Sequence, residues 1–582
     1  MLKVLSRSIR EYKRSSMLAP FFVALEVIIE CIIPFVTANL INKINKNEYD
    51  MPTLLRDAGL LVLLALLSLT CGALSGHFCS VAACGFAKNL RHDMYTKIQS
   101  FSFSNIDKFS TSSLVTRLTT DINNVQFAYM MIIRTAVRCP LMLVFAFTMA
   151  VVVGGSVSFA FALIIPFLAV GLLLIVKFSW GIFHSVFRKY DNLNASVQEN
   201  VSGMRVVKSF VREDYEIKKF NTASDNIAAD FTKAEKIIAL NSPLMQLSIH
   251  ALMIGICLLG SRLIITTSQA ALEVGDLASL ITYGIQILMS LMILSMIIVT
   301  IALSMASAKR IVEVLNEEPS IKNPTSPITS VADGSIEFGA VSFKYSEKAE
   351  RNALENITVS IKAGETVGII GGTGSGKSSL VSLIPRLYDV SSGSVKVGGV
   401  DVREYDIEAL REDVAMVLQK NILFAGTIKE NIRWGDPNAT DDEIVRICRL
   451  AQAEEFIEKF PDKYDTHIEQ GGANVSGGQK QRLCIARALI KKPKILILDD
   501  STSAVDTKTD ALIRRAFAEE IPNTTKIIIA QRISSVSEAD KIIVMDNGRI
   551  ESIGNHDYLL MHSPIYKEVY ESQVKGGNSD EN

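Results

Sequence analysis

The chain carries almost no net charge. Its 582 residues include 60 Lys and Arg against 61 Asp and Glu. Such a balance lacks the broad positive field that nucleic-acid binding requires, so no nucleic-acid partner is expected. Gly (34) and Pro (15) are at ordinary levels and no repeat is visible, which excludes fibrous and disordered classes of protein.

Cysteines are few and show no metal-binding pattern. None of the eight forms a CxxC pair, so the sequence predicts no zinc knuckle, and a disulfide framework is not expected in a chain of this length. Six of them lie in or beside apolar stretches, where they are expected to act as small buried apolar residues.

Apolar residues are abundant, and they are unevenly distributed. Hydrophobic residues make up 48% and charged residues 21% of the chain, with a mean hydropathy of +0.27, which suggests an average over two unlike halves. Six apolar segments precede residue 305, and each supplies the ~20 residues needed to cross the hydrocarbon of a membrane. The predicted spans are 17–41, 57–83, 130–154, 157–183, 243–268 and 277–304.

Loop charges predict the orientation of these spans. Lys and Arg gather in the N-terminal stretch and in the connections after the second and fourth spans, whereas the short turns 154–157 and 269–276 have neither. The loop 42–56 departs from this pattern, but the balance predicts that both termini are cytoplasmic. The two long connections mix polar and apolar residues at helical intervals, so the helices are expected to extend well into the cytosol.

A few charges lie inside the predicted spans. Glu26 and Glu30 are one helical turn apart and share a face, as do Arg134 and Arg138, while Arg262 lies in the fifth span. A charge at mid-bilayer costs ~2.5–3.5 kcal/mol on insertion scales, so these side chains should face protein or water. Glu26 and Glu30 are candidates for a path taken by a polar or cationic substrate, with structural pairing as the alternative. For the three arginines, pairing or a helix end at the membrane surface is favoured.

The composition changes after Ser307. The segment 309–334 holds three prolines among Ser, Thr and Asn, and reads as a linker. Beyond it, short apolar strands alternate with helical patterns, which predicts an α/β domain with a largely parallel sheet. The sequence therefore predicts an all-α six-helix transmembrane domain (1–308), the linker (309–334), an α/β P-loop NTPase domain (335–570) and a flexible tail (571–582). The predicted strands are 336–343, 365–371, 414–418, 495–499, 526–530 and 541–546.

One strand runs directly into a phosphate-binding loop. The residues after Thr366–Ile370 match the pattern G-x-x-x-x-G-K-[ST] between a strand and a helix, where glycines let backbone N–H groups turn towards phosphates. Lys377 would reach the β- and γ-phosphates, and Ser378 would ligate Mg²⁺. The nucleotide-binding candidates are Gly371, Gly372, Thr373, Gly374, Ser375, Gly376, Lys377, Ser378 and Ser379.

Two further motifs identify a family. The buried strand Ile495–Leu498 leads into Asp499, a carboxylate placed to meet Mg²⁺. Between it and the phosphate loop, Val475-Ser476-Gly477-Gly478-Gln479 resembles the LSGGQ signature of ATP-binding cassette (ABC) proteins, with Val in place of Leu. Together with six preceding spans, nearly the whole chain resembles a half-transporter of the ABC exporter type.

This resemblance implies further roles. ATP and Mg²⁺ are the expected ligands, with Tyr345 stacking on adenine, Gln419 contacting Mg²⁺ and the transmembrane domain, and Asp506, in the loop 503–506, crossing a dimer interface. Segments 106–120 and 211–220 match the coupling helices that dock on the nucleotide-binding domains. In such exporters each ATP lies between one subunit's phosphate loop and the other subunit's signature, so the resemblance implies a dimer.

Two residues depart from the family pattern. Asp500 stands where the family has a Glu that polarises the attacking water, and Gln531 stands where it has a His. Together they predict the degenerate subunit of a heterodimeric exporter, whose partner carries the Glu and the His. Resemblance to such bacterial multidrug exporters implies the plasma membrane as location, surrounding lipid as a partner, and amphipathic drugs or lipids as cargo. A peptide exporter and an ATP-gated regulatory or channel-like membrane protein remain as alternatives.

Overall fold

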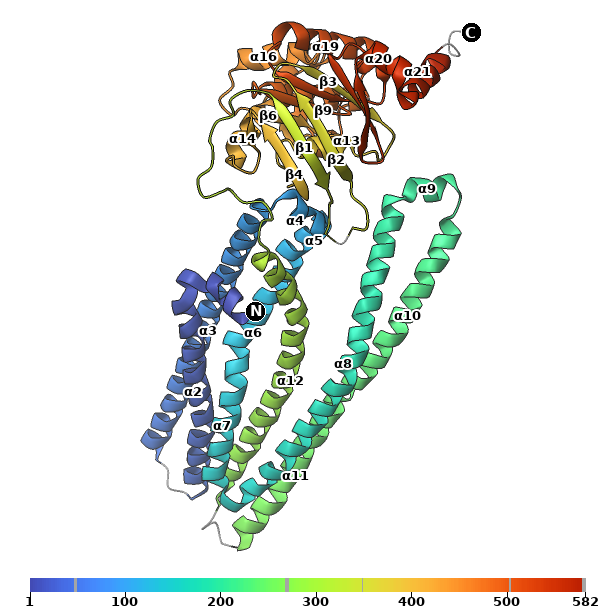
Figure 1. Ribbon diagram of the computed structural model, residues 1–582. Coiled ribbons are helices and arrows are strands. Elements are labelled where there is room, and N and C mark those ends of the chain that lie inside the picture. Colours follow the sequence, from blue (N-terminus) through green and yellow to red (C-terminus); the bar gives the residue numbers. More distant parts are fainter. Residues whose placement is uncertain (47–49, 267–271, 348, 502–503, 578–582) are drawn as a thin grey trace. The chain divides into compact units, whose positions relative to one another are not determined.

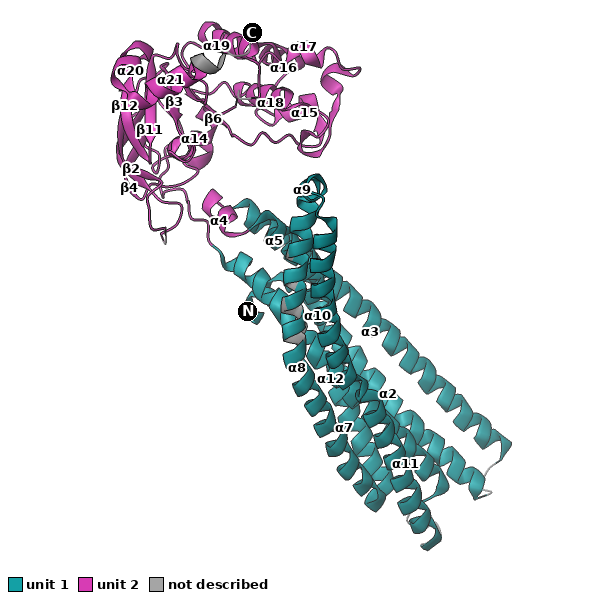
Figure 2. Ribbon diagram, turned by 90° about the vertical axis from the view of Figure 1, so that its right-hand side faces the viewer, with its two compact units in different colours: residues 1–100, 110–317 teal, residues 101–109, 318–582 magenta. Residues whose placement is uncertain are grey.

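The computed structural model describes residues 1–46, 50–266, 272–347, 349–501 and 504–577. They form two compact units, residues 1–100 with 110–317 and residues 101–109 with 318–582 (Figure 2). The first unit runs to Glu317, and its last helix ends at Asn316. The first eight residues of the predicted linker 309–334 are therefore helical, and the prediction placed the start of the linker too early. The end of the predicted tail, 578–582, lies outside the described residues.

All the regular secondary structure in the described residues of the first unit is helical, as the apolar segments predict (Figure 1). A short turn separates the third and fourth predicted spans, where Gly155 has a φ of +48°, which residues with a side chain rarely adopt. The helices are α1 (Leu2–Leu5), η1 (Ser6–Tyr12), α2 (Lys13–Asn45), α3 (Met51–Gln99), α5 (Thr111–Thr116), η2 (Arg117–Asp121), α6 (Ile122–Ile133), α7 (Thr135–Gly154), η3 (Gly155–Ser158), α8 (Phe159–Ser202), α9 (Met204–Ser209), α10 (Glu213–Ala239), α11 (Asn241–Thr266) and α12 (Val274–Asn316).

The predicted spans lie in these long helices. Within the described residues, five helical stretches are long and apolar enough to cross a membrane, and one of them, Thr111–Ser179, contains both the third predicted span and most of the fourth. The end of the fifth span, residues 267–268, and the first three residues of the turn 269–276 lie outside the described residues. Helices α3 and α8 continue well beyond their apolar parts, which confirms the predicted helical extensions after the second and fourth spans.

Apolar side chains from five helices form the core of the first unit. Val27 in α2, Ala146 in α7, Phe161 in α8, Ile256 in α11 and Tyr283 in α12 are all fully buried. The Tyr283 hydroxyl donates a hydrogen bond to the Cys31 carbonyl oxygen at 2.7 Å, so the one polar atom of this large side chain has a partner.

The second unit contains two main sheets. The strand order of the larger sheet is β12-β11-β3-β10-β9-β6, in which all neighbours are parallel except the β11–β12 pair. A second, antiparallel sheet has the order β2-β1-β4-β5. The strands are β1 (Ile336–Phe343), β2 (Leu354–Ile361), β3 (Thr366–Gly371), β4 (Ser392–Val397), β5 (Val400–Asp401), β6 (Val414–Val417), β7 (Gly426–Thr427), β8 (His467–Ile468), β9 (Ile495–Asp499), β10 (Thr525–Ile529), β11 (Lys541–Asp546) and β12 (Arg549–Gly554).

All six predicted strands are present, but the assignment of the first to a parallel sheet was wrong. β1 lies in the antiparallel sheet, because it pairs with β2 and β4. The helices of this unit are α4 (Phe103–Lys108), α13 (Lys377–Ser382), α14 (Ile407–Asp413), α15 (Ile428–Arg433), α16 (Asp441–Leu450), α17 (Glu454–Ile457), α18 (Gly477–Leu489), α19 (Thr507–Glu520), α20 (His556–His562) and α21 (Pro564–Gly577).

The short helix α4 belongs to the second unit, although its neighbours in the chain belong to the first (Figure 2). Asp107 accepts a 2.6 Å hydrogen bond from the Tyr388 hydroxyl, and the Phe103 ring contacts the Tyr388 ring edge-on. The predicted coupling segment 106–120 covers the end of α4, all of α5 and most of η2, and the predicted segment 211–220 falls largely in α10. The coupling role of both segments stays a prediction.

Candidate nucleotide site and membrane charge cluster

Four neighbouring parallel strands place the candidate nucleotide-site residues at one edge of the large sheet. The phosphate loop follows β3, Gln531 follows β10, Asp499 ends β9 and Gln419 follows β6. The carboxyl ends of parallel strands meet at the same edge, which is where α/β proteins bind ligands. The fold therefore brings together residues that lie up to 160 positions apart in the sequence.

The phosphate loop has the backbone that its glycines predict. Gly374 and Gly376 have φ of +81° and +98°, and a Cβ on Gly376 would lie 2.9 Å from the Ala353 carbonyl oxygen. The Lys377 ammonium donates hydrogen bonds to the carbonyl oxygens of Gly371 and Gly372, at 2.8 and 2.7 Å. Burial lowers the pKa of Lys377, and the charges of Asp499 and Asp500 oppose that shift.

Ser378 and Asp499 are joined across the sheet edge. The Ser378 hydroxyl donates a 3.0 Å hydrogen bond to Oδ1 of Asp499, a residue that is only 4% exposed. Burial raises the pKa of Asp499, as does the neighbouring charge of Asp500, while the Ser378 hydrogen bond opposes both. A hydroxyl and a single buried carboxylate fit Mg²⁺, which takes few protein ligands and completes its shell with phosphate oxygens and water.

The two departures from the family pattern contact one another. The Gln531 amide donates a 2.8 Å hydrogen bond from Nε2 to Oδ2 of Asp500. Burial raises the pKa of the Asp500 carboxyl, and side-chain hydrogen bonds from Gln531 and Gln419 oppose the rise. Gln419, expected to contact Mg²⁺, therefore lies against the Asp500 carboxylate. Asp500 also has a φ of +51°, a left-handed conformation that Asp tolerates better than most residues.

Tyr345 stands beside the end of the phosphate loop. Its hydroxyl is 2.8 Å from Oγ of Ser379, and its ring contacts the rings of Phe343 and Tyr388 edge-on. The residue is 50% exposed, so part of the ring remains open to a ligand. This arrangement is compatible with the predicted stacking on adenine.

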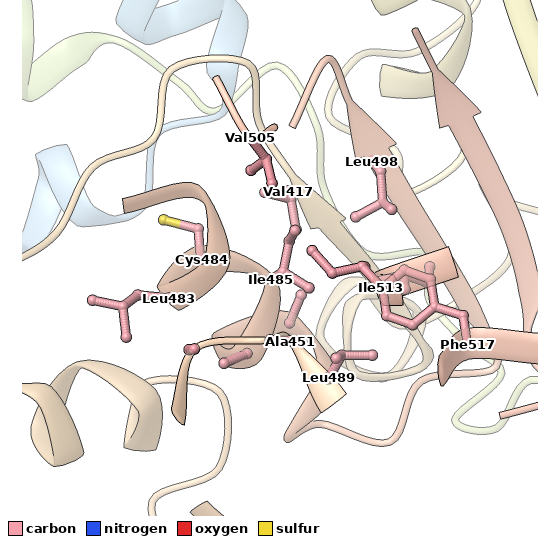
Figure 3. Close-up of a cluster of buried hydrophobic side chains, with 14 of the residues drawn as sticks. Val417, Ala451, Leu483, Cys484, Ile485, Leu489, Leu498, Val505, Ile513 and Phe517 are labelled. Carbon is pink, nitrogen blue, oxygen red and sulfur yellow. The ribbon is translucent and has the colours of Figure 1, made fainter. Parts of the chain in front are cut away.

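The signature segment is the N-terminal cap of α18. Ser476 accepts a hydrogen bond from the Gln479 backbone N–H at 3.3 Å, and the Gln479 side chain accepts one from the Ser476 N–H at 2.8 Å. This reciprocal capping box leaves Ser476 and Gly477 exposed, while Val475 is buried in the core. Behind them, α18 packs through Leu483, Ile485 and Leu489 in a cluster that also contains Leu498 of β9 and Phe517 of α19 (Figure 3).

The loop after β9 contains two contacts that the sequence did not indicate. The Ala504 N–H donates to Oε1 of Gln481 in α18 at 3.0 Å, and the Ser501 hydroxyl donates to the Val417 carbonyl oxygen at 3.1 Å. Asp506, expected at a dimer interface, caps α19 by accepting the Thr509 N–H at 2.9 Å. Ser503 lies outside the described residues.

In the membrane unit, one arginine pairs with both candidate acidic residues. Arg138 donates from Nη1 to Oε1 of Glu26 at 2.6 Å, and from Nη2 to Oε2 of Glu30 at 2.7 Å. Glu26 is buried, and its Oε2 has no hydrogen-bond partner among the described residues. Arg134 stands at the break between α6 and α7, and Arg262 lines a small cavity with Ser156 and Val157. The structural-pairing interpretation thus fits Arg138, and the candidate substrate path at Glu26 and Glu30 stays a prediction.

Removing this arginine should destabilise the first unit. We expect Arg138→Met to cost about 3 kcal/mol, because it leaves two carboxylates without their counter-charge in a region of low dielectric constant. The thermal unfolding midpoint in detergent measures the loss. Adding Glu26→Gln and Glu30→Gln should restore most of the lost stability. The control is Arg262→Met, which removes an arginine with no ion pair in the described part of the chain. Equal shifts for the two arginine variants would contradict the pairing account.

Comparisons with known proteins agree with this arrangement. The family model "ABC transporter transmembrane region" matches residues 16–307, and the model "ABC transporter" matches residues 354–503. The chain is 38% identical over 510 residues to the "Uncharacterized ABC transporter ATP-binding protein YfiB" of Bacillus subtilis, covering 88% of each chain. It is 33% identical over 578 residues to the protein of the same description, Rv1273c, of Mycobacterium tuberculosis, covering 98% of each.

A solved structure shares the fold. The "Structure of a bacterial Atm1-family ABC exporter with ATP bound" has a TM-score of 0.83 to this chain at 24% identity, covering 96% of this chain and 99% of that one. The predicted fold class, a helical transmembrane domain followed by an α/β nucleotide-binding domain, is thereby confirmed.

Proposed function

Because the chain belongs to the ABC transporter family and is an ATP-driven, multi-pass membrane exporter, we propose that it is one unequal half of a heterodimer. In this proposal its own ATP site binds ATP and hydrolyses it slowly. Its signature, Val475 to Gln479, completes the partner's competent site. The partner is a second half-transporter that carries Glu and His at the positions of Asp500 and Gln531.

The contact between Gln531 and Asp500 is the observation that carries this proposal. A water attacking the γ-phosphate needs a carboxylate placed to orient it, and Asp is one methylene shorter than Glu. The Asp500 oxygen that faces Gln531 is already occupied by that amide at 2.8 Å. Gln531 can hydrogen-bond a phosphate, but it is neither a cation nor a proton donor of the kind a His supplies.

The remaining residues are suited to hold ATP. In the proposed site Lys377 leaves the loop carbonyls for the phosphates, and Tyr345 stacks on the base. Ser378 and Asp499 would hold Mg²⁺, which, when bound, neutralises charge on the phosphate oxygens. Asp500 then orients a water less well than a Glu would, so nucleotide remains bound for longer than at the partner's site. Closure of the two cassettes on ATP would move the helical unit through the coupling helices.

The cargo of the proposed pair is a small amphipathic molecule, a drug or a lipid. The pair is located in a bacterial plasma membrane, and both termini of this chain are in the cytoplasm. Basic residues in the long connections of the first unit support that orientation. The two carboxylates of Glu26 and Glu30 against one guanidinium leave an excess negative charge beside the proposed path for cationic cargo.

Uphill transport in vesicles tests the proposal. The chain and its partner half are reconstituted together, and accumulation of a fluorescent amphipathic dye is followed against its gradient. We expect ATP-dependent uphill accumulation that Lys377→Ala in this chain reduces and the same change in the partner abolishes. ATP-dependent flux that only runs downhill would instead favour the channel-like alternative. Equal loss from the two lysine variants would contradict unequal sites.

A further inference from the structure

The C-terminal helix α21 is anchored on the body of the second unit. One face of the helix carries Tyr566, Val569 and Tyr570, which pack on the buried cluster around α18. Tyr566 is fully buried, and its hydroxyl lies 2.7 Å from Nδ1 of His556 in α20. The same face continues, at helical spacing, to Gln573. These contacts fix the start of the helix, and with it the position of Gln573.

Gln573 makes two hydrogen bonds to the backbone of the segment that carries Gln531. Its Nε2 donates to the Gln531 carbonyl oxygen at 2.8 Å, and its Oε1 accepts the Ile533 N–H at 2.9 Å. The side-chain amide offers a donor and an acceptor on the same carbon, whereas an ionised carboxylate offers acceptors alone. Nothing in the motifs of the sequence indicated this residue, which lies 42 positions after Gln531.

This clamp acts on the backbone of Gln531, while the side-chain amide of Gln531 bonds to Asp500. The segment leaves β10 at Ile529 and enters the short helix η6 (Ile533–Ser535). Its first residue, Ala530, still donates its N–H to the Ile369 carbonyl oxygen of β3 at 3.4 Å, and the chain then turns away from the sheet. On one side Gln573 holds the Gln531 carbonyl, and on the other the Gln531 amide donates to Asp500 beside the phosphate loop. The position of that amide thus depends on Gln573.

We propose that Gln573 is a positioning residue of the nucleotide site, which holds Gln531 where its amide contacts the γ-phosphate and so makes the site prefer ATP to ADP. The inference rests on the proposed ATP site. When ATP is bound, the amide keeps one N–H on Asp500 and donates its second N–H to the terminal phosphate oxygen. ADP lacks that phosphate, so its binding does not depend on Gln531 or on the clamp.

Nucleotide affinities of the full-length chain in detergent test the inference. A fluorescent ATP analogue is displaced by MgATP or by MgADP. Gln573→Leu should weaken ATP about tenfold, the order expected for one hydrogen bond to a charged phosphate, and leave ADP unchanged. Gln573→Glu keeps the acceptor for Ile533 but loses the donor to Gln531, so it should lose the same preference. The control is Ser572→Ala, because that exposed hydroxyl bonds only within α21.

The outcomes separate this inference from the proposed function. If Gln573→Leu and Gln573→Glu leave the ratio of ATP to ADP affinity unchanged, the clamp does not position Gln531. If both nucleotides weaken equally and the unfolding midpoint falls, Gln573 is a structural strut and the inference is wrong. Failure of the unsubstituted chain to bind MgATP would overturn the proposed site itself.

Discussion

Replacing Ser476 with Ala is expected to slow ATP turnover of the assembled pair about 10²-fold, the usual effect of losing one preorganised hydrogen-bond donor to developing charge. Ser476 is exposed at the start of α18, where its hydroxyl oxygen accepts the Gln479 N–H and its proton can be donated to a nucleotide held by the other subunit. In the proposed pair that nucleotide lies in the competent site. The same change in the partner faces the slow site of this chain and should have a much smaller effect.

A matched control separates this role from loss of a helix cap. Thr440 caps α16 through the same kind of capping box, accepting the Glu443 N–H at 3.3 Å. Ser476→Ala and Thr440→Ala should each cost about 1 kcal/mol of stability. Steady-state ATP hydrolysis of the reconstituted pair should fall only for Ser476→Ala. Comparable turnover in the two variants would show that the signature of this chain does not complete a competent site.

Joint replacement of the two departures should restore hydrolysis at this chain's own site. With the partner's phosphate-loop lysine changed to Ala, Asp500→Glu combined with Gln531→His is expected to raise turnover about 10²-fold over the unsubstituted chain. Each single change should recover only a few-fold. A longer carboxylate alone remains bonded to the Gln531 amide, and a His alone faces a carboxylate one methylene too short.

The measurement is ATP hydrolysis of the two single variants, the double variant and a control variant, each paired with the partner whose phosphate-loop lysine is changed to Ala. Residues in one hydrogen-bonded unit are not additive, so the double variant should exceed the product of the single effects. Asp500→Asn with Gln531→His, which lacks the carboxylate, should stay at background. Full recovery from Asp500→Glu alone would mean that Gln531 takes no part in the impairment.

Local patterns in the sequence were enough to predict the phosphate loop and the strand ending at Asp499. Both are contiguous motifs whose strand, turn and helix are set by adjacent residues. The assignment of β1 to the parallel sheet failed because pairing with β2 and β4 is a non-local choice that periodicity does not carry. The sequence did not predict the bounds of the short helices α4 and α9, because polar and apolar residues mix throughout the long connections.

Contacts between distant residues decided the rest of the site. Helical spacing shows that Glu26 and Glu30 share a face and that Arg134 and Arg138 share another, but only the packing of α2 against α7 selects Arg138. The Gln531–Asp500 contact follows from the parallel pairing of β9 with β10, which aligns Ile529 with Asp499. Neither relation is visible in a single sequence, because each depends on the register of elements far apart in the chain.

ATP turnover by the purified chain without its partner tests the central claim most directly. The full-length chain is reconstituted alone and with the partner half, and steady-state hydrolysis is compared at saturating MgATP. The account predicts that the chain alone binds MgATP but turns over about 100-fold more slowly than the pair, because both of its sites would carry Asp500 and Gln531. A chain that hydrolyses ATP alone as fast as the pair does would contradict it.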